Sequence, residues 1–508
     1  MQKEQPAVPY AIELRGVSKR FGQVQANRNI CLTVKRGEIL ALLGENGSGK
    51  TTLMNMLSGI YKPDSGQIFL HGREVSIRSP REAIQLGVGM IHQHFKLVDV
   101  LTARENILLG EGGRKRRDLN DLCARFGLNV SLDKKIYDMS VGEKQTVEIL
   151  KVLARGADIL ILDEPTAVLT PQETERLFDI LRKMREDNRA IVIITHKLNE
   201  VMAISDRVTI LRRGESIDTV ETARTHVQHL TELMGGRPVD LQIHRAEAEP
   251  GETLLDVREV TVRSAEGGER LKNVSFTLQA GEILGVAGVA GSGQKEMCEA
   301  IAGLQAIHGG QITLTGQRID GLTPREIIQK GISMSFIPED RLGMGLVGGM
   351  NLTDNMLLKT YRDQKGMLLS RKPARALARR LIERLKISTP GVNIAVKKLS
   401  GGNVQKVLLG REIDSNPRVL ITAYPVRGLD INSSHTIYDL LNEQKQRGVG
   451  ILFIGEDLDV LLELSDRILV MCGGRVTAIV PAIFATKELL GMKMTDALKA
   501  EKSEETYV

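Results

Sequence analysis

The stretch Gly44-Glu45-Asn46-Gly47-Ser48-Gly49-Lys50-Thr51 decides the fold, because it satisfies the pattern G-x-x-x-x-G-K-[ST]. It follows the apolar run 39–43 and precedes the helical run 52–57, so a strand leads into a glycine-rich loop and a helix leaves it. Glycines let successive backbone N–H groups close around phosphate oxygens, and the helix N-terminus adds positive potential. The pattern therefore predicts a phosphate-binding loop in which Lys50 neutralises the β- and γ-phosphates and Thr51 binds Mg²⁺.

A second strand ends in two acids. The apolar run 159–162 is followed by Asp163 and Glu164, and a switch from apolar to acidic marks the C-terminal edge of a parallel sheet. Taken alone, the two acids could be solvated turn residues. With a phosphate-binding loop upstream, we expect Asp163 on the Mg²⁺ side and Glu164 positioned to polarise an attacking water.

The chain repeats itself. Residues 37–40 (GEIL) recur as residues 281–284, an offset of 244, and residues 205–207 (SDR) recur as residues 465–467, an offset of 260. The second half has therefore gained 16 residues, which we place around residues 343–349 and after Tyr361. A period this long indicates a duplicated domain rather than a solenoid. We expect domains at 1–240 and 241–508, joined by a short polar linker.

Both halves alternate β-branched apolar runs with longer amphipathic segments, which is typical of a mostly parallel sheet covered by helices. The predicted fold class is α/β, twice over. A length of 508 residues, with 42% hydrophobic and 26% charged residues, suits a multidomain globular protein.

Composition argues against several functions. The formal charge of +6 is spread over the chain, and the densest basic run, 114–117, is followed at once by Asp118, so we expect a solvated loop and no nucleic-acid partner. The 4 cysteines lie far apart, which disfavours zinc and disulfides. We see no signal peptide and no apolar run of the ~18 residues that a bilayer requires, so we expect a soluble, cytoplasmic chain.

Further motifs carry a resemblance to the ATP-binding-cassette (ABC) family. Residues 139–143 (MSVGE) precede the acidic strand, where that family keeps its LSGGQ-like signature, and residues 167–170 (AVLT) occupy its D-loop position. Gln93 matches the Q-loop glutamine, His196 the switch histidine and Phe21 the aromatic that stacks on adenine. The resemblance implies two tandem P-loop NTPase domains, each with a mostly parallel core sheet, an antiparallel β part and a helical subdomain.

The same resemblance implies ATP and Mg²⁺ as cofactors. Its catalytic residues would be Lys50, Gln93, Glu164 and His196, and its Mg²⁺ ligands Thr51, Gln93 and Asp163. Its ATP-binding residues would be Phe21, Gly44, Glu45, Asn46, Gly47, Ser48, Gly49, Lys50, Thr51, Thr52, Ser400, Gly401, Gly402 and Asn403.

The second half has lost the catalytic residue types. Gln294 stands at the lysine position, and Lys295 does not simply substitute for it, because one residue along a helix turns a side chain by about 100°. The other replacements are Ala423 and Tyr424 for the two acids, Glu456 for the histidine, Glu339 for the glutamine and Ser264 for the stacking aromatic. Phosphoryl transfer depends on positioned charge, so this degenerate pocket should not hydrolyse ATP.

One second-half motif is better preserved than its first-half counterpart. Residues 399–403 (LSGGN) keep both glycines, whereas Val141 interrupts the first-half motif. Taken alone, Ser400 is a plain helix N-cap. In the ABC family two cassettes meet head to tail, so the resemblance implies intrachain pairing, in which Ser400, Gly401 and Gly402 complete the first half's site.

Twin cassettes without membrane spans occur in importers, in ribosome-binding factors and in DNA-repair ATPases. The short linker, one degraded site and scattered cysteines resemble the fused ATPases of ribose- and galactose-type importers, and residues 90–98 and 165–170 resemble the nucleoside-uptake branch. The resemblance implies a peripheral subunit on the cytoplasmic face of the membrane. Its partners would be integral-membrane permease subunits and an extracytoplasmic substrate-binding lipoprotein. A non-transport ATPase acting on ribosomes or DNA is the alternative.

Overall fold

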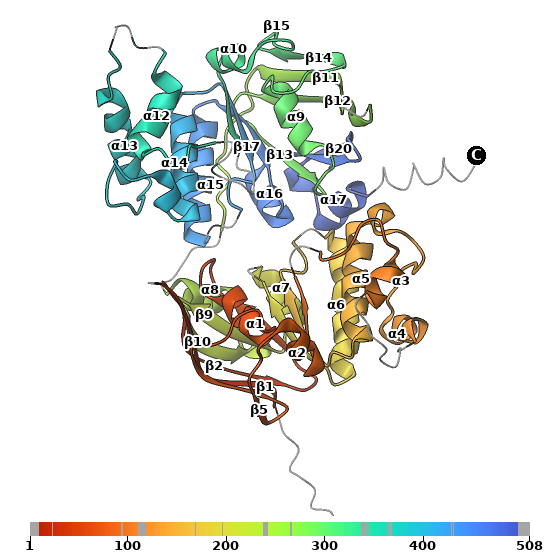
Figure 1. Cartoon of the computed structure of the whole chain (residues 1–508). Helices are drawn as coiled ribbons and strands as arrows, with labels where there is room; N and C mark the ends of the chain where they lie inside the picture. Colours follow the sequence, from red (N-terminus) through yellow and green to blue (C-terminus); the bar gives the residue numbers. More distant parts are fainter. Residues whose placement is uncertain are drawn as a thin grey trace, which may run out of the picture. The chain divides into compact units, whose positions relative to one another are not determined.

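The computed structural model describes residues 10–22, 24–92, 95–109, 118–167, 169–195, 197–236, 242–264, 267–336, 342, 345–362, 364, 368–427, 429 and 431–495. The chain divides into two compact units, residues 1–240 and 241–508, and each is considered by itself (Figure 1). Within the described ranges, no helix has the length and apolar character needed to span a bilayer.

The first unit is built on a six-stranded sheet in the order β10-β9-β3-β8-β7-β6. All neighbouring strands are parallel except β9 and β10, which pair antiparallel. The strands are β3 (Ile39–Leu43), β6 (Val88–Ile91), β7 (Ile159–Asp163), β8 (Ala190–Ile194), β9 (Arg207–Arg212) and β10 (Glu215–Glu221). The predicted mostly parallel core sheet is confirmed.

A smaller antiparallel sheet in the order β2-β1-β4-β5 lies in the same unit. Its strands are β1 (Tyr10–Phe21), β2 (Val24–Lys35), β4 (Ser65–Leu70) and β5 (Arg73–Val75). The helices of the unit are α1 (Lys50–Leu57), α2 (Pro80–Gln85), α3 (Ala103–Leu108), α4 (Leu119–Phe126), α5 (Val141–Ala154), α6 (Pro171–Glu186), α7 (Leu198–Ile204) and α8 (Val227–Gly235). The antiparallel part predicted by the resemblance is therefore present.

The core sheet is buried on both faces, which explains its nearly continuous apolar strands. Along β8, Ile191 and Ile193 pack into a core with α4, α5 and α6, whereas Val192 and Ile194 pack into a second core with α1 and the antiparallel sheet. The acids of the candidate site begin where β7 ends.

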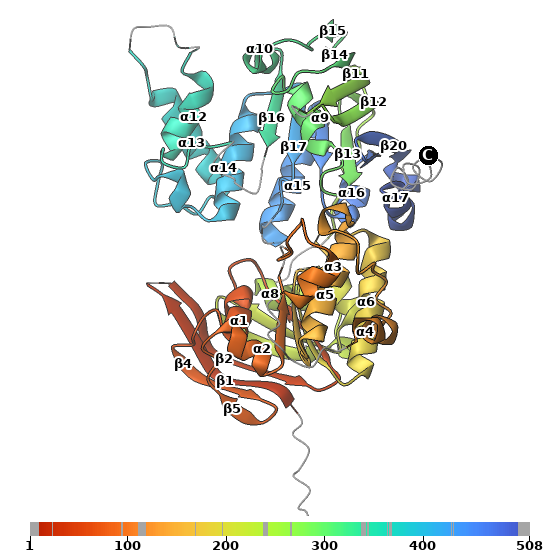
Figure 2. The same cartoon turned by 45° about the vertical axis from the view of Figure 1, so that its right-hand side comes forward.

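The second unit repeats this architecture. Its core sheet has the order β16-β17-β18-β13-β19-β20, and its antiparallel sheet the order β12-β11-β14-β15 (Figure 2). The strands are β11 (Thr253–Arg263), β12 (Glu269–Gln279), β13 (Ile283–Gly288), β14 (Gly309–Leu314), β15 (Gln317–Arg318), β16 (Ile332–Phe336), β17 (Val419–Ala423), β18 (Gly450–Ile454), β19 (Arg467–Cys472) and β20 (Arg475–Pro481). The helices are α9 (Gln294–Ile301), α10 (Pro324–Gln329), α12 (Leu352–Thr360), α13 (Lys372–Arg384), α14 (Gly401–Asp414), α15 (Ile431–Gln446), α16 (Leu458–Leu464) and α17 (Lys487–Lys493).

Most of the second unit's extra length falls in one place. An isolated bridge joins Thr102 to Lys135 in the first unit and Asn351 to Ala395 in the second. Its partners are 33 residues apart in the first case and 44 in the second, so 11 of the 16 extra residues lie between them. They lengthen the α12–α13 region, where α13 has 13 residues and its counterpart α4 has 8.

Candidate nucleotide site

The glycine-rich loop between β3 and α1 has a backbone that only glycine adopts easily. Gly47 and Gly49 have φ angles of 81° and 97°, in the left-handed region. A Cβ at Gly49 would lie 2.4 Å from the carbonyl oxygen of Ala26, so the close approach also requires glycine. The loop is thus held in one conformation by neighbouring backbone.

The N-terminus of α1 opens toward this loop without a side-chain cap, because Gly49 occupies the N-cap position. Its first N–H groups therefore have no side-chain acceptor. Within the described part of the chain, the buried hydroxyl of Ser48 also has no hydrogen-bond partner. Uncapped donors, an orphaned hydroxyl and a helix dipole together form a cradle that fits phosphate oxygens.

Lys50 is buried in the loop, with 6% of its surface exposed. Its Nζ donates to the carbonyl oxygens of Gly44, at 2.6 Å, and Glu45, at 3.0 Å. Burial lowers the pKa of Lys50, and the carboxylates of Glu164, Asp163 and Glu45 oppose that shift. Carbonyl oxygens compensate a buried ammonium only in part, so an anionic phosphate is a better partner for this cation.

The two acids lie where β7 ends. Asp163 is the last residue of the strand, and the N–H of Glu164 donates to the carbonyl oxygen of Ile194 on β8 at 2.9 Å. Burial and the charge of Glu164 raise the pKa of Asp163 to about 6, while Lys50 acts in the opposite direction. Burial and the neighbouring carboxylate thus destabilise the charged form of Asp163, which a bound cation would stabilise.

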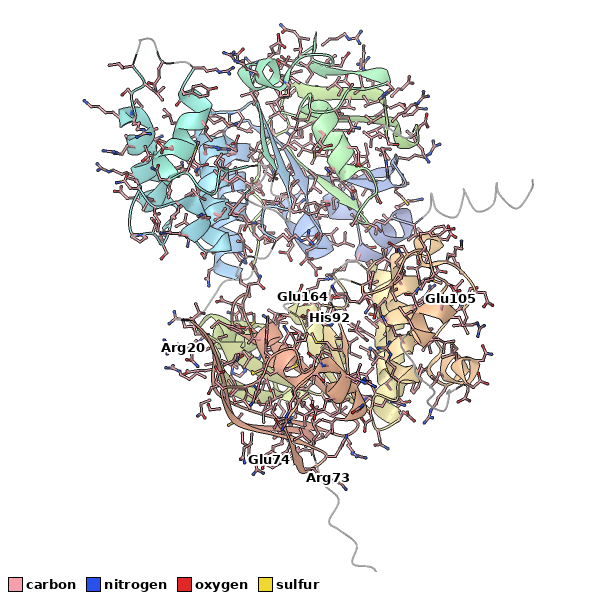
Figure 3. The ribbon with its side chains drawn as sticks, viewed as in Figure 1. Arg20, Arg73, Glu74, His92, Glu105 and Glu164 are labelled. Atoms are coloured by element: carbon pink, nitrogen blue, oxygen red, sulfur yellow. The ribbon has the colours of Figure 1, made fainter. Side chains whose placement is uncertain are left out.

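Glu164 adopts a left-handed backbone with a φ of 47°. This conformation costs about 1–2 kcal/mol for a residue with a Cβ, and it turns the chain sharply out of the strand. Figure 3 shows Glu164 and His92 at the same edge of the unit, as expected for residues that follow the paired parallel strands β7 and β6. Burial lowers the pKa of His92, so its ring is uncharged at neutral pH.

The donor set at this edge suits Mg²⁺. Thr51 offers an exposed hydroxyl and Asp163 a half-buried carboxylate. Among the residues that the structure describes, no cluster of three or more His, Cys, Asp and Glu side chains could hold a metal ion. A Mg²⁺ ion here would accordingly take its remaining ligands from phosphate oxygens and water, which is its habit in nucleotide sites.

Phe21 ends β1 with its ring partly exposed, at 42%. Tyr61 packs edge-on against it, with ring centroids 5.1 Å apart, and Lys19 Nζ lies 5.5 Å from the centroid. One aromatic face supported from the side is the arrangement that stacking on a planar base requires.

The sequence did not reveal a small network beside the acids. Thr166 Oγ1 donates to Glu200 at 2.6 Å, and Lys197 Nζ reaches both Glu200, at 3.0 Å, and the carbonyl oxygen of Thr166, at 3.3 Å. The network joins the turn after β7 to the start of α7. The i, i+3 spacing of Lys197 and Glu200 hints at a helical ion pair, but their contact with Thr166 depends on the tertiary fold.

Three candidate site residues, Gln93, His196 and Glu339, lie outside the described residues, as does the basic run 114–117. Their predicted roles therefore remain predictions.

The second unit keeps the shape of the loop and replaces its charge. Gly291 and Gly293 have φ angles of 87° and 104°, and Gln294, with 3% of its surface exposed, donates from Nε2 to the carbonyl oxygen of Val289 at 3.2 Å. Val289 occupies the position of Glu45, so Gln294 repeats a hydrogen bond of Lys50 without the positive charge. Lys295 points to solvent, with 62% of its side chain exposed, and lies 3.8 Å from Glu299.

The two acids of the first unit have no acidic counterparts at the matching positions of the second unit. Ala423 is buried at the end of β17, and Tyr424 has a φ of 52°, close to that of Glu164. Burial raises the pKa of Tyr424 to about 12, so its hydroxyl stays protonated. Glu456 is exposed and forms an ion pair with Arg427 at 3.3 Å. Ser264, at the position of Phe21, offers no ring.

The two signature motifs differ at their helix N-termini. In the first unit Ser140 and Glu143 form a capping box, in which the Glu143 N–H donates to Ser140 Oγ at 3.2 Å and the Ser140 N–H to Glu143 Oε2 at 2.7 Å. Lys134 Nζ forms an ion pair with the same carboxylate, at 2.8 Å from Glu143 Oε2. This N-terminus is therefore already occupied by an acid.

In the second unit Ser400 is the N-cap of α14, but its side chain accepts no backbone N–H. Its Oγ instead accepts from Asn403 Nδ2 at 2.8 Å, and Asn403 Oδ1 accepts from the Ser388 N–H at 3.0 Å. The N–H groups of the first turn of α14 thus lack a side-chain acceptor. The free N–H groups of an uncapped N-terminus with two glycines can donate hydrogen bonds to an anionic oxygen.

Several known proteins are similar in sequence to this chain. The family model described as ABC transporter matches residues 27–167 and 271–425. The chain is 42% identical to the nucleoside import ATP-binding protein of Lactococcus lactis, over 95% of this chain and 97% of that protein. It is 43% identical to the guanosine import ATP-binding protein of Bacillus subtilis, over 97% and 98%, and 39% identical to the glucose import ATP-binding protein of Haloferax volcanii, over 95% of each.

Among solved structures, the archaeal ribosome recycling factor bound to a ribosomal stalk protein aligns with 92% of this chain and 90% of its own length. The TM-score is 0.60 and the sequence identity 18%. At that identity the likeness concerns the twin-cassette fold alone.

Proposed function

Since the chain belongs to the ABC transporter family and is an ATP-binding ATPase, we propose that it drives an importer of nucleosides or simple sugars through a separate permease. Relatives named for nucleoside, guanosine and glucose import, each matched over nearly its whole length, support an import function. We favour nucleosides as the cargo, because the relatives with nucleoside names are 42% and 43% identical to the chain, whereas relatives named for glucose or ribose import are 36–40% identical. The resemblance of residues 90–98 and 165–170 to the nucleoside-uptake branch points the same way.

We further propose one hydrolysis site per chain, made from the first unit's loop and the second unit's signature. The contrast between the two signature helices carries this proposal. The N-terminus of α14 lacks a side-chain cap, whereas Glu143 places a carboxylate at the N-terminus of α5, where it would repel a γ-phosphate. In the proposed site Ser400, Gly401 and Gly402 face the nucleotide that the first unit holds.

Within that site the first unit's residues would divide the chemistry. The loop N–H groups and Lys50 would bind the phosphates and stabilise the charge that develops on the transferred group. Thr51 and Asp163 would hold Mg²⁺, which neutralises phosphate charge when bound. Glu164 would accept a hydrogen bond from the attacking water and then its proton. Gln93 and His196 would make further contacts to the water and the γ-phosphate. Phe21 would stack on the adenine.

We propose that the second pocket does not hydrolyse ATP. Gln294 carries no charge, Ala423 and Tyr424 offer no carboxylate, and the acid Glu456 is turned to Arg427. Without a cation at the phosphates or a base for water, phosphoryl transfer lacks the electrostatic assistance on which it depends. The pocket's retained backbone would instead hold α14 in position.

An importer motor works against a permease, so we propose that the chain is a peripheral subunit on the cytoplasmic face of the membrane. Cargo specificity would lie in the permease and in an extracytoplasmic binding lipoprotein. No cargo site is needed in this chain, and no nucleic acid is required as a partner.

The test is nucleoside uptake by cells that lack the gene for this chain. Complementation with the wild-type chain should restore import of radiolabelled nucleoside, and Glu164→Gln should not, although that variant should still copurify with two membrane subunits. The variant Tyr424→Gln, the same change at the matching position, should restore import. Copurification with ribosomes instead of membrane subunits, or full import by Glu164→Gln, would refute the proposal.

A further inference from the structure

The outer end of the α12–α13 pair exposes apolar side chains. Leu368 is 89% exposed and Leu369 is 54% exposed, and Leu358 and Tyr361 at the end of α12 are 40% and 41% exposed. In Figures 1 and 2 this pair forms the outer edge of the second unit, with α14 between it and the core sheet. Grouped apolar side chains on a surface commonly mark a contact site.

A stripe of cations follows the two leucines. Lys372, Arg375 and Arg379 are spaced by three and four residues, so they share one face of α13, opposite the buried Ala374 and Ala378. All three are exposed, and none of them has an acidic partner within ion-pair distance among the described residues. The exposed Glu383, four residues after Arg379, forms no ion pair with it there.

Other cations of the same helix are used differently. Arg380 forms an ion pair with Asp414, and Arg384 forms one with Glu443. The stripe is therefore distinct from the arginines that attach α13 to α14 and α15. We call Leu368, Leu369, Lys372, Arg375 and Arg379 the α12–α13 tip.

Side-chain contacts fix the tip in place. Arg371 joins the start of α13 to Asp354 on α12 at 3.1 Å, and Lys359 joins α12 to the buried Glu412 of α14 at 2.6 Å. The side chain of Gln364 bonds both backbone groups of Ser370, at 2.9 and 2.8 Å. The apolar and cationic groups are thus presented by an ordered support.

Over its described residues, 118–126, the corresponding part of the first unit shows no such stripe. The buried positions Leu119, Leu122 and Phe126 of α4 have the same spacing as Ala378, Leu381 and Leu385. That alignment places Asn120 and Asp121 opposite Arg379 and Arg380, whereas the positions that match Lys372 and Arg375 precede Asp118 and lie outside the described residues. Arg379 therefore has no basic counterpart on α4.

We propose that the α12–α13 tip binds a membrane surface containing anionic phospholipids. Leu368 and Leu369 would enter the interface between headgroups and acyl chains, and Lys372, Arg375 and Arg379 would contact lipid phosphates. Unpaired cations match an anionic surface, and two exposed leucines suit a lipid interface better than a nucleic acid. The inference rests on the proposed function, because a motor docked on a permease is held beside the bilayer.

The test is sedimentation of the purified full-length chain with phosphatidylcholine vesicles, with and without phosphatidylglycerol. The wild-type chain should bind only the anionic vesicles, and less tightly as salt increases. The triple variant Lys372→Gln, Arg375→Gln and Arg379→Gln should bind about a hundredfold more weakly, given about 1 kcal/mol for each basic residue near the surface. The double variant Leu368→Ser and Leu369→Ser should lose about a hundredfold or more if both side chains enter the acyl region.

A matched control is Arg73→Gln, Arg78→Gln and Arg81→Gln, three exposed arginines of the first unit. It removes the same charge from a chain of net charge +6 and should leave vesicle binding unchanged. Three results would overturn the inference. These are an equal loss of binding in both triple variants, no vesicle binding by the wild-type chain, and a wild-type chain that binds duplex DNA but not anionic vesicles. The assay uses neither ATP nor permease, so failed binding with intact import would leave the proposed function standing, and intact binding with failed import would refute only that function.

Discussion

The two nucleotide loops share a backbone and differ in chemistry. Gly47 and Gly49 have nearly the φ angles of Gly291 and Gly293, and the strained conformation of Glu164 recurs at Tyr424. The two loops differ in charge. The positions of Lys50, Asp163 and Glu164 in the first unit correspond to Gln294, Ala423 and Tyr424 in the second. A scaffold can therefore be kept while its catalytic residue types are replaced, which is understandable if the second unit must still hold α14 correctly.

The largest expected effect comes from removing the proposed base. Glu164→Gln should lower kcat for ATP by about a thousandfold, because the amide cannot accept the proton of the attacking water, while ATP affinity stays unchanged. Steady-state ATPase measurements on the assembled transporter would show this. Tyr424→Gln makes the same side chain at the matching position, and a loss of comparable size there would break the comparison.

The loop lysine should rank next. Lys50→Gln converts the first loop to the chemistry of the second and should lower kcat/KM for ATP by about a hundredfold, because the phosphates lose a buried cation. ATP hydrolysis and nucleotide-binding titrations check the effect. The reciprocal change Gln294→Lys should not create a second active pocket, since Ala423 and Tyr424 still supply no carboxylate; a doubled turnover would contradict the account.

The helix caps allow a test in which stability and activity move in opposite directions. Asn403→Glu would give α14 the Ser-x-x-Glu capping box of α5, which should add about 0.5–1 kcal/mol to the free energy of unfolding of the second unit. The new carboxylate should also repel the γ-phosphate and reduce turnover by about tenfold.

Thermal unfolding and ATPase assays would be read together. Glu143→Asn, which gives α5 the residue found in α14, serves as the matched control and should lower stability without reducing turnover. Unchanged activity in Asn403→Glu would argue against a nucleotide at α14.

The smallest effect is expected from the network beside the acids. Valine stands at the matching position of the second unit, as Val426. The variant Thr166→Val removes a hydrogen bond to the charged Glu200. A loss of about 1 kcal/mol in positioning corresponds to about a fivefold lower kcat, with little change in KM. Val426→Thr should have no effect, and an equal loss in both variants would assign the effect to packing.

The sequence was most informative where one residue type is required by local geometry. The glycines around Lys50 and the apolar run before Asp163 fixed a loop, a strand and their order, and the repeated motifs predicted the second copy. The left-handed backbone of Glu164 was not foreseeable, because an acidic residue does not favour that conformation.

Contacts between distant segments were also beyond the sequence. Ser400 reads as an ordinary N-cap, and its diversion to Asn403 depends on Ser388, which the fold brings close. Thr166 lies 31 positions before Lys197, and nothing in either residue announces their contact. Local patterns report local constraints, whereas these interactions exist only after the core has formed.

The most direct test of the account locates the γ-phosphate position by vanadate trapping. Vanadate bound in place of the γ-phosphate oxidises adjacent serines on irradiation and cuts the chain there, so mass spectrometry of the fragments identifies the contacting loops. The account predicts cuts at Ser48 of the first loop and Ser400 of the second signature. Cuts at Ser292 and Ser140 would place the hydrolysed nucleotide in the other pocket and contradict it.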